Sequence, residues 1–266
     1  MTNRRQPVRF LSSALLPIPT TFLAYIRSVK PMPAATNEIA YTLEHSPAYS
    51  LLRLDLKANQ TVLVEAGAMA AMDSCIEMKS KMRGGLMKGL GRMLGGESLF
   101  ISEFTAKGKP GQLYIAPGVP GDVKHYRLQD KALIVQSAGF VAASPDVNLD
   151  TKFQGVKGFF SGESLFMIRA SGQGDFWFSS YGAILEIPVS GSYVVDTGYI
   201  VAFEESLNYK VEAINGLSFK GLGTAIFGGE GLVCRFSGEG KLWVQSRNLS
   251  PLLNFLMPFR PLKSSS

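Results

Sequence analysis

Apolar and polar residues alternate in short runs along most of the chain. In residues 51–56, LLRLDL, every second position is a leucine that would lie on one buried face of a strand, namely Leu52, Leu54 and Leu56. Similar short runs are separated by glycine-containing turns, which is typical of β-sandwiches and β-barrels. The pattern therefore predicts an all-β fold.

Three stretches of this β-rich sequence resemble one another. Apolar runs with a central glycine occur as VLVEAGAMAAM at 62–72, LIVQSAGFVAA at 133–143 and YVVDTGYIVAF at 193–203. They align on Gly67, Gly139 and Gly198. A glycine inside a strand pattern indicates a bulge, a bend or a close backbone approach.

A second recurring segment follows each of these runs. The segments are GQLYI at 111–115, GDFWF at 174–178 and GKLWV at 240–244, so Tyr114, Trp177 and Trp243 are equivalent. Because both tryptophans of the chain occupy one repeat position, we expect them to pack in the core or between repeats. Stacking on a ligand is the alternative interpretation.

A glycine-rich segment lies between the two in every copy. It reads KGLGRMLGGESLF at 88–100, KGFFSGESLF at 157–166 and KGLGTAIFGGEGL at 220–232, with glutamates at Glu97, Glu163 and Glu230. None of the copies has the Gly-Lys-Ser/Thr of a phosphate-binding loop, so a structural joint is the simpler interpretation. The glutamates are expected to pair locally, and the alternative is a shared cation on a common axis.

The repeats predict three tandem β-sandwich-like units in a pseudo-threefold array. Their expected limits are 38–118, 119–188 and 189–247, after a basic extension at 1–37 and before a C-terminal helix and tail at 248–266. In that last segment Ser250 is expected to cap the helix, Pro251 to occupy its first turn and Pro258 to end it. A helix this short needs a surface to dock on, within an oligomer by preference, or on the body or a membrane.

The net charge of +6 is concentrated at one end of the chain. Residues 1–31 carry five Lys or Arg and no acidic residue, which leaves the other 235 residues close to neutral. A near-neutral body argues against nucleic-acid binding. The extension is interpreted as dispensable or mis-started before Met32, as a transit peptide, or as a membrane-touching arm. The expected location is the cytoplasm of a prokaryote, or a mitochondrion or other organelle if the extension is a transit peptide.

Two surface features carry the candidate binding residues. Residues 79–94, KSKMRGGLMKGLGRML, combine cations with apolar side chains, and the candidate membrane or partner contacts are Lys88, Leu90, Arg92 and Leu94. A loop folded over the sandwich with its cations in water is the alternative. Three equivalent lysines, Lys88, Lys157 and Lys220, form a candidate rim for RNA or another anionic ligand.

Residues suited to catalysis are scarce. The two histidines are His45, expected before the first strand, and His125, expected in a turn-to-strand region. Motifs such as HExxH or GxSxG are missing, and Cys75 and Cys234 lie too far apart in sequence for a metal-ligand pair. We therefore expect two free thiols, no catalytic residue, no metal and no cofactor.

Four segments resemble one known family. They are EAGAMAAM at 65–72, KMRGGLMKGLGRMLGGESLF at 81–100, SGESLF at 161–166 and SPLLNFLMPF at 250–259. Over residues 38–259 the chain resembles uncharacterised bacterial, archaeal and fungal proteins related to a mitochondrial biogenesis protein, named for altered inheritance of mitochondria. The resemblance implies a double-stranded β-helix type of fold like that of the tryptophan RNA-binding attenuation protein. It also implies a homotrimer, a link to inner-membrane organisation and no catalytic residues.

Together these observations predict a non-catalytic oligomeric scaffold or binding protein. It would engage a membrane surface or a protein partner, in membrane or respiratory-chain organisation. Binding of RNA or another anionic ligand at the lysine rim is the alternative.

Overall fold

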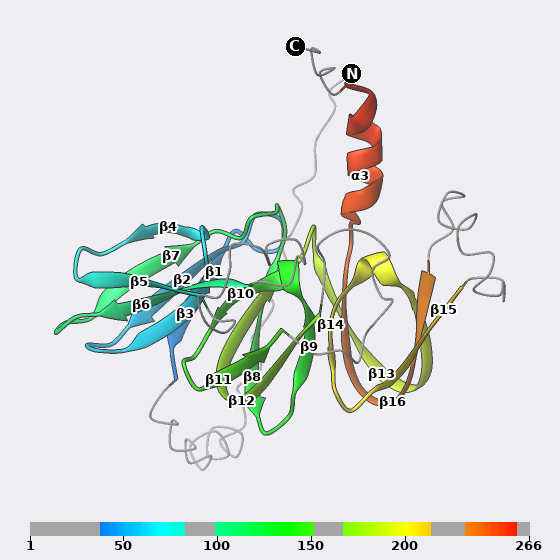
Figure 1. Ribbon diagram of the computed structural model, residues 1–266, viewed down its shortest axis with the longest axis horizontal. Coiled ribbons are helices and arrows are strands. Elements are labelled where there is room, and N and C mark those ends of the chain that lie inside the picture. Colours follow the sequence, from blue (N-terminus) through cyan, green and yellow to red (C-terminus); the bar gives the residue numbers. More distant parts are fainter. Residues whose placement is uncertain (1–37, 83–98, 152–166, 214–231, 260–266) are drawn as a thin grey trace, which may run out of the picture. The chain divides into compact units, whose positions relative to one another are not determined.

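The computed structural model describes residues 38–82, 99–151, 167–213 and 232–259. Within these ranges the chain forms strands, short 3-10 helices and one α-helix (Figure 1). The strands of the first half are β1 (Ala40–Glu44), β2 (Leu51–Leu56), β3 (Thr61–Glu65), β4 (Met69–Met72), β5 (Ile76–Met82), β6 (Phe100–Ala106), β7 (Gly111–Ile115) and β8 (Val123–Gln129). The remaining elements are β9 (Leu133–Gln136), η2 (Ser137–Gly139), β10 (Phe140–Ala143), β11 (Val147–Asp150), β12 (Met167–Ser179), β13 (Ile184–Asp196), η3 (Thr197–Tyr199), β14 (Ile200–Glu204), β15 (Asn208–Ala213), β16 (Leu232–Gln245), α3 (Leu249–Leu256) and η5 (Met257–Phe259).

The named strands form two antiparallel sheets. A four-stranded sheet has the order β1-β2-β7-β4. A twelve-stranded sheet follows the path β13-β16-β14-β9-β12-β10-β3-β6-β5, with β8, β11 and β15 attached beside it. The all-β prediction is thus confirmed. The alternation in β2 has the expected effect, because its three alternate leucines are at most 1% exposed.

One irregularity of pairing recurs in three strand pairs. The register shifts between Met69 and Ala71 where β4 meets β7, between Phe140 and Ala142 where β10 meets β12, and between Ile200 and Ala202 where β14 meets β16. After each shift an alanine lies opposite an aromatic residue, in the pairs Ala71–Tyr114, Ala142–Trp177 and Ala202–Trp243. The three aromatic residues aligned in the sequence therefore occupy corresponding places in these strand pairs.

A side chain at the C-terminal end of each of these strands, or just beyond it, accepts an equivalent backbone hydrogen bond. The backbone N–H of Gln112 donates to Asp73 at 2.8 Å, that of Asp175 to Ser144 at 2.9 Å and that of Lys241 to Glu204 at 3.1 Å. The glycines follow the pattern less closely. In the strand register Gly67 and Gly198 correspond, whereas Gly139 lies one residue further along, and of the three only Gly67 has a left-handed backbone, with φ of +89°.

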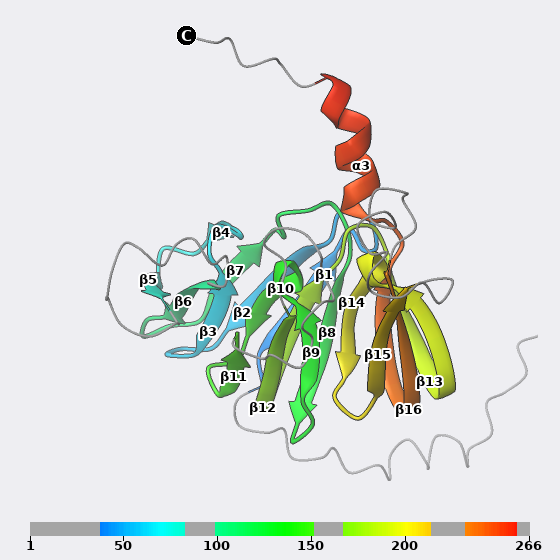
Figure 2. The ribbon, with the colours of Figure 1, turned by 45° about the vertical axis from the view of Figure 1, so that its right-hand side comes forward.

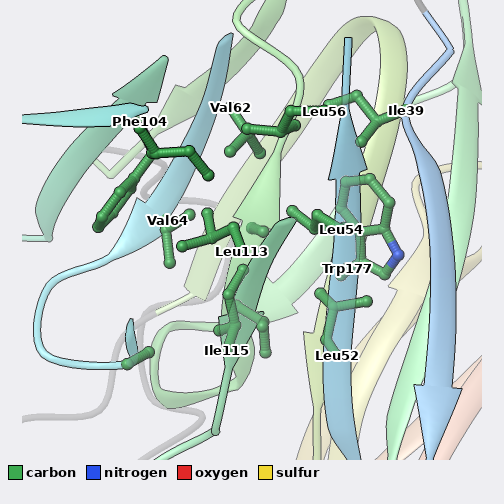
Figure 3. Packing of buried hydrophobic residues seen from close by; sticks show 14 of the residues in the cluster. Ile39, Leu52, Leu54, Leu56, Val62, Val64, Phe104, Leu113, Ile115 and Trp177 are labelled. Carbon is green, nitrogen blue, oxygen red and sulfur yellow. The ribbon is translucent and has the colours of Figure 1, made fainter. Parts of the chain in front are cut away.

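Two short seams join successive groups of strands. At the first, β10 pairs with β3, and at the second, β14 pairs with β9 beside it (Figure 2). Large aromatic side chains cross both seams. Trp177 of β12 packs into the core that β2, β3 and β7 line, next to Leu52 and Leu54 (Figure 3). Trp243 of β16 packs likewise into the core around β9, β10 and β12.

Three sequence expectations differ from the observed elements. The expected limit between residues 188 and 189 falls inside β13, both halves of which pair with β16. His45 follows β1 rather than preceding the first strand, and His125 lies in the middle of β8. Turn residues close to strand ends misled both histidine assignments, because the periodic signal is weak in strands of only five to seven residues.

Candidate functional site

The binding residues expected from the sequence lie outside the described residues. This applies to the loop contacts Lys88, Leu90, Arg92 and Leu94, to the rim lysines Lys88, Lys157 and Lys220, and to Glu97, Glu163 and Glu230. They stay predictions. Two other features of the described residues have the character of a site: a buried polar cluster on β8 and β12, and the exposed helix α3.

The polar cluster centres on the carboxylate of Asp175, whose side chain is 1% exposed. Its Oδ1 accepts hydrogen bonds from Nε2 of His125 at 2.9 Å and from the guanidinium of Arg127 at 2.8 Å. Its Oδ2 accepts one from the backbone N–H of Ile39, also at 2.9 Å. Burial raises the pKa of this carboxyl, but the hydrogen bonds outweigh it and hold the pKa below its ordinary value.

The register of β8 and β12 explains how these groups meet. His125 lies opposite Trp177 and Arg127 opposite Asp175, so residues about fifty positions apart in sequence become direct neighbours. The ring of His125 also contacts Tyr41, with centroids 4.7 Å apart. Through these hydrogen bonds the cluster ties Ile39, just before β1, to β8 and β12.

The two equivalent tryptophans differ in their polar surroundings. Nε1 of Trp243 donates to Glu186 at 3.0 Å, whereas Nε1 of Trp177 is buried and has no acceptor among the described residues. Burial raises the pKa of Glu186, but hydrogen bonds from Lys241, Lys124 and Trp243 outweigh it and lower the pKa to about 2. His125 takes the position of Glu186 in the register and uses its nitrogen for Asp175 instead.

The cysteines lie apart from this cluster. Both are free thiols, as expected, and Cys234 is fully buried. Burial raises the pKa of the Cys234 thiol to about 12, so it stays protonated at neutral pH. Within the described ranges no group of three His, Cys, Asp or Glu side chains is arranged to hold a metal ion.

The second feature is the C-terminal apolar segment, which we define as α3 together with η5, residues 249–259. Asn248 caps it by accepting from the N–H of Ser250 at 3.0 Å, so the cap expected at Ser250 is wrong. The reason is that the helix begins at Leu249, which places Ser250 inside its first turn. The helix ends at Leu256, and Pro258 lies within η5.

No residue of this segment is buried. Its large apolar side chains are exposed, up to 66% for Phe255 and 73% for Phe259. Residues 240–266 contain four Lys or Arg and no Asp or Glu. An exposed cluster of large apolar side chains is typical of an interaction surface. Among the described residues, no helix is both long and apolar enough to cross a membrane.

Comparison with known proteins gives a family and a related structure. Residues 41–247 match the family model described as "Mitochondrial biogenesis AIM24". An uncharacterised protein of Streptococcus pyogenes serotype M6 is 28% identical over 240 residues, which cover 86% of this chain and 94% of that protein. The crystal structure of a Streptococcus pyogenes protein aligns with a TM-score of 0.69 and 26% identity, over 84% of this chain and 100% of the other.

Proposed function

The chain belongs to the mitochondrial biogenesis AIM24 family, and on that premise we propose that it is a non-catalytic, oligomeric scaffold of three related β units. In this proposal it attaches peripherally to an anionic membrane surface through the C-terminal apolar segment, and it supports membrane organisation. The family matched is the one that the sequence motifs had indicated. The likeness to the tryptophan RNA-binding attenuation protein stays a prediction.

The observation that supports the membrane proposal most directly is that no residue of the C-terminal apolar segment is buried. The free energy falls when leucine, phenylalanine and methionine side chains move from water into the boundary between head groups and acyl chains. Arg247, just before the segment, is exposed and adds attraction to anionic lipids of about 1 kcal/mol when it is close to the surface. Both contributions act in the same direction at the same end of the chain.

The recurring pairings support the three-unit part of the proposal. Each unit would consist of equivalent strands. In each, the alanine–aromatic pair that follows the register shift and the backbone N–H that donates to a side chain of the neighbouring strand would lie at corresponding positions. In this scheme β13 supplies two strands of the third unit, which therefore begins at residue 184 rather than 189. Buried polar groups that join neighbouring strands, such as the Asp175 cluster, are consistent with a scaffold because they stabilise the arrangement of the strands.

Vesicle co-sedimentation tests the membrane attachment. The full chain is incubated with phosphatidylglycerol-containing vesicles and with pure phosphatidylcholine vesicles. We expect binding to the anionic vesicles and at least a tenfold loss of it in the variant Phe255→Asp/Phe259→Asp. Tyr49→Asp is the matched control, because Tyr49 and Phe259 are both 73% exposed. Its binding should equal that of the native chain.

Two results would contradict the membrane proposal. One is native binding that the paired phenylalanine variant leaves unchanged, which would remove the segment from the contact. The other is a native chain that stays in the supernatant with both vesicle types. In that case the apolar segment would have to serve a protein partner.

A further inference from the structure

Several strands of the described chain, among them β4 and β13, are paired along one edge only. Among the described residues β4 pairs only with β7, and β13 pairs only with β16 (labelled in Figure 1). Within the described residues, each therefore leaves a row of backbone N–H and C=O groups unpaired on its outer edge. Proteins normally cover such edges or protect them with charged side chains or proline. β4 carries neither, and in β13 the segment from Ser190 to Val195 carries neither, since Glu186, Pro188 and Asp196 lie outside it.

The two internal seams show how strands of this kind pair within the chain. At the first seam Ala142 lies opposite Val64 and Ala143 opposite Leu63. At the second seam Ala202 lies opposite Val135 and Phe203 opposite Ile134. These are corresponding positions, so the same contact occurs twice in one register.

The open edges carry the two halves of that same contact. Ala71 and Met72 of β4 correspond to the alanine side of each seam, because Ala71 lies opposite Tyr114 as the seam alanines lie opposite the tryptophans. Val194 and Val195 of β13 correspond to the other side. Val194 lies opposite Arg235 just as Ile134 lies opposite Arg169 in the second seam.

Burial separates the satisfied positions from the open ones. At the seams Leu63 and Ile134 are 4% and 1% exposed, whereas their counterpart Val194 is 44% exposed. On the opposite side Phe203 is fully buried, whereas its counterpart Met72 is 39% exposed. These apolar side chains therefore occupy positions that are covered wherever a neighbouring strand is present.

We propose that β13 of one copy of this chain pairs antiparallel with β4 of a second copy, with Val195 opposite Ala71 and Val194 opposite Met72. The partner is another copy because one chain carries both complementary edges in the register of its own seams. Tyr114 of the second copy would then lie against a third core, which Val189 of β13, Phe203 of β14 and Phe236 of β16 help to form. Trp177 and Trp243 lie in the same way against the first core, around β2, β3 and β7, and the second, around β9, β10 and β12. Such a head-to-tail contact generates a ring if it closes and a filament if it does not.

This inference names the interface for the oligomer in the proposed function and rests on its three-unit organisation. It does not depend on membrane attachment. The strand addition supplies backbone hydrogen bonds, and the covered valine and methionine side chains supply apolar burial.

Mixed disulfide cross-linking tests the register. In a Cys75→Ser/Cys234→Ala background, which also removes the thiol opposite Val195, Met72→Cys is mixed with Val194→Cys, and Ala71→Cys with Val195→Cys. One of the two pairs must be the non-hydrogen-bonded type, whose side chains are closer. We expect at least one mixture to give a disulfide-linked dimer containing one copy of each variant, and each variant alone to give none.

A mismatched mixture provides the control. Met78 of β5 is 50% exposed. A mixture of Met78→Cys with Val194→Cys should give at most a tenth of the cross-linked dimer that the matched mixture gives. Equal cross-linking of matched and mismatched mixtures would overturn the proposal, and so would the absence of any cross-link. An internal disulfide in a monomer carrying both Met72→Cys and Val194→Cys would overturn it too, because the chain would then close on itself.

Native mass spectrometry of the unmodified chain separates this inference from the proposed function. Multiples of 28.8 kDa that dissociate to monomer in Val194→Asp, with an unchanged circular dichroism spectrum, support the interface. An oligomer that survives Val194→Asp and fails to cross-link would refute the interface but leave the oligomeric scaffold standing. A native chain that is only monomeric would refute both.

Discussion

Replacing each tryptophan by phenylalanine should destabilise the protein to very different extents. Trp177 and Trp243 occupy the same register position and are 0% and 1% exposed, so the lost indole volume is nearly the same. The cost of the smaller side chain therefore cancels in the comparison. The remaining difference in stability comes from the indole N–H group, which has an acceptor in Trp243 and none among the described residues in Trp177.

The polar difference can be estimated from the structure. Trp243→Phe removes a hydrogen bond to the charged carboxylate of Glu186, which stabilises by about 1.5 kcal/mol at the low end of the range for a partly exposed acceptor. Trp177→Phe instead removes a buried N–H without an acceptor, which relieves about 1 kcal/mol of desolvation cost. We expect Trp243→Phe to lower the free energy of unfolding by about 2 to 3 kcal/mol more than Trp177→Phe.

Urea unfolding followed by far-ultraviolet circular dichroism measures the difference, because that signal does not depend on which tryptophan remains. A double-mutant cycle with Glu186→Gln provides the control, since Trp243→Phe should cost less once the charged acceptor is gone. Equal destabilisation by the two substitutions, or a larger loss for Trp177→Phe, would refute the reasoning.

Two further predictions concern buried carboxyl groups. Asp175→Asn should lower the free energy of unfolding by about 3 kcal/mol at pH 7, because the three donors around it lose a buried negative charge. Glu77→Gln, at an exposed ion pair, is the control and should cost less than about 0.5 kcal/mol. Urea unfolding of the two variants measures the difference. Because the folded pKa of Asp175 is lowered, its stabilisation is present above the unfolded pKa and is lost as pH falls through the folded value, so the difference between native and Asp175→Asn should vanish in acid. Glu65 has the opposite sign: burial raises its pKa from 4.5 to about 7, so the stability that its neutral form provides at acid pH is lost as pH rises through that interval. Glu65→Gln should therefore raise Tm at pH 8 and leave it unchanged at pH 4, and an equal shift at both values would contradict the assignment.

The sequence predicted features that depend on local periodicity. The alternating leucines of β2, the recurring glycine-containing runs and the recurring aromatic segments were visible because each lies within a few residues of chain. The glycine alignment was less accurate at Gly139. Strand register is set by cross-strand pairing, and a one-residue difference in the preceding turn leaves it unchanged.

The polar cluster was not predicted, because its members come from separate strands. His125 and Arg127 are two residues apart and so share a face of β8, but nothing local indicates that Asp175 lies opposite them. The spacing in VKHYRLQ was the available signal, since it places a histidine and an arginine on one side of a strand. The helix cap was misplaced for a related reason: Asn248 and Ser250 are both good capping residues, and only the backbone decides between them.

The tryptophans that cross the seams constrain how such a chain can be shortened or extended in evolution. Removing the last group of strands would leave an indole-sized hole in the middle core, where Trp243 now lies. A duplication at the C-terminal end, by contrast, would supply a new aromatic residue to the third core and a new strand to the β13 edge. Gene rearrangements in this family should therefore add whole groups of strands at the C-terminal end, and removal of the last group or an internal excision should leave a chain that aggregates.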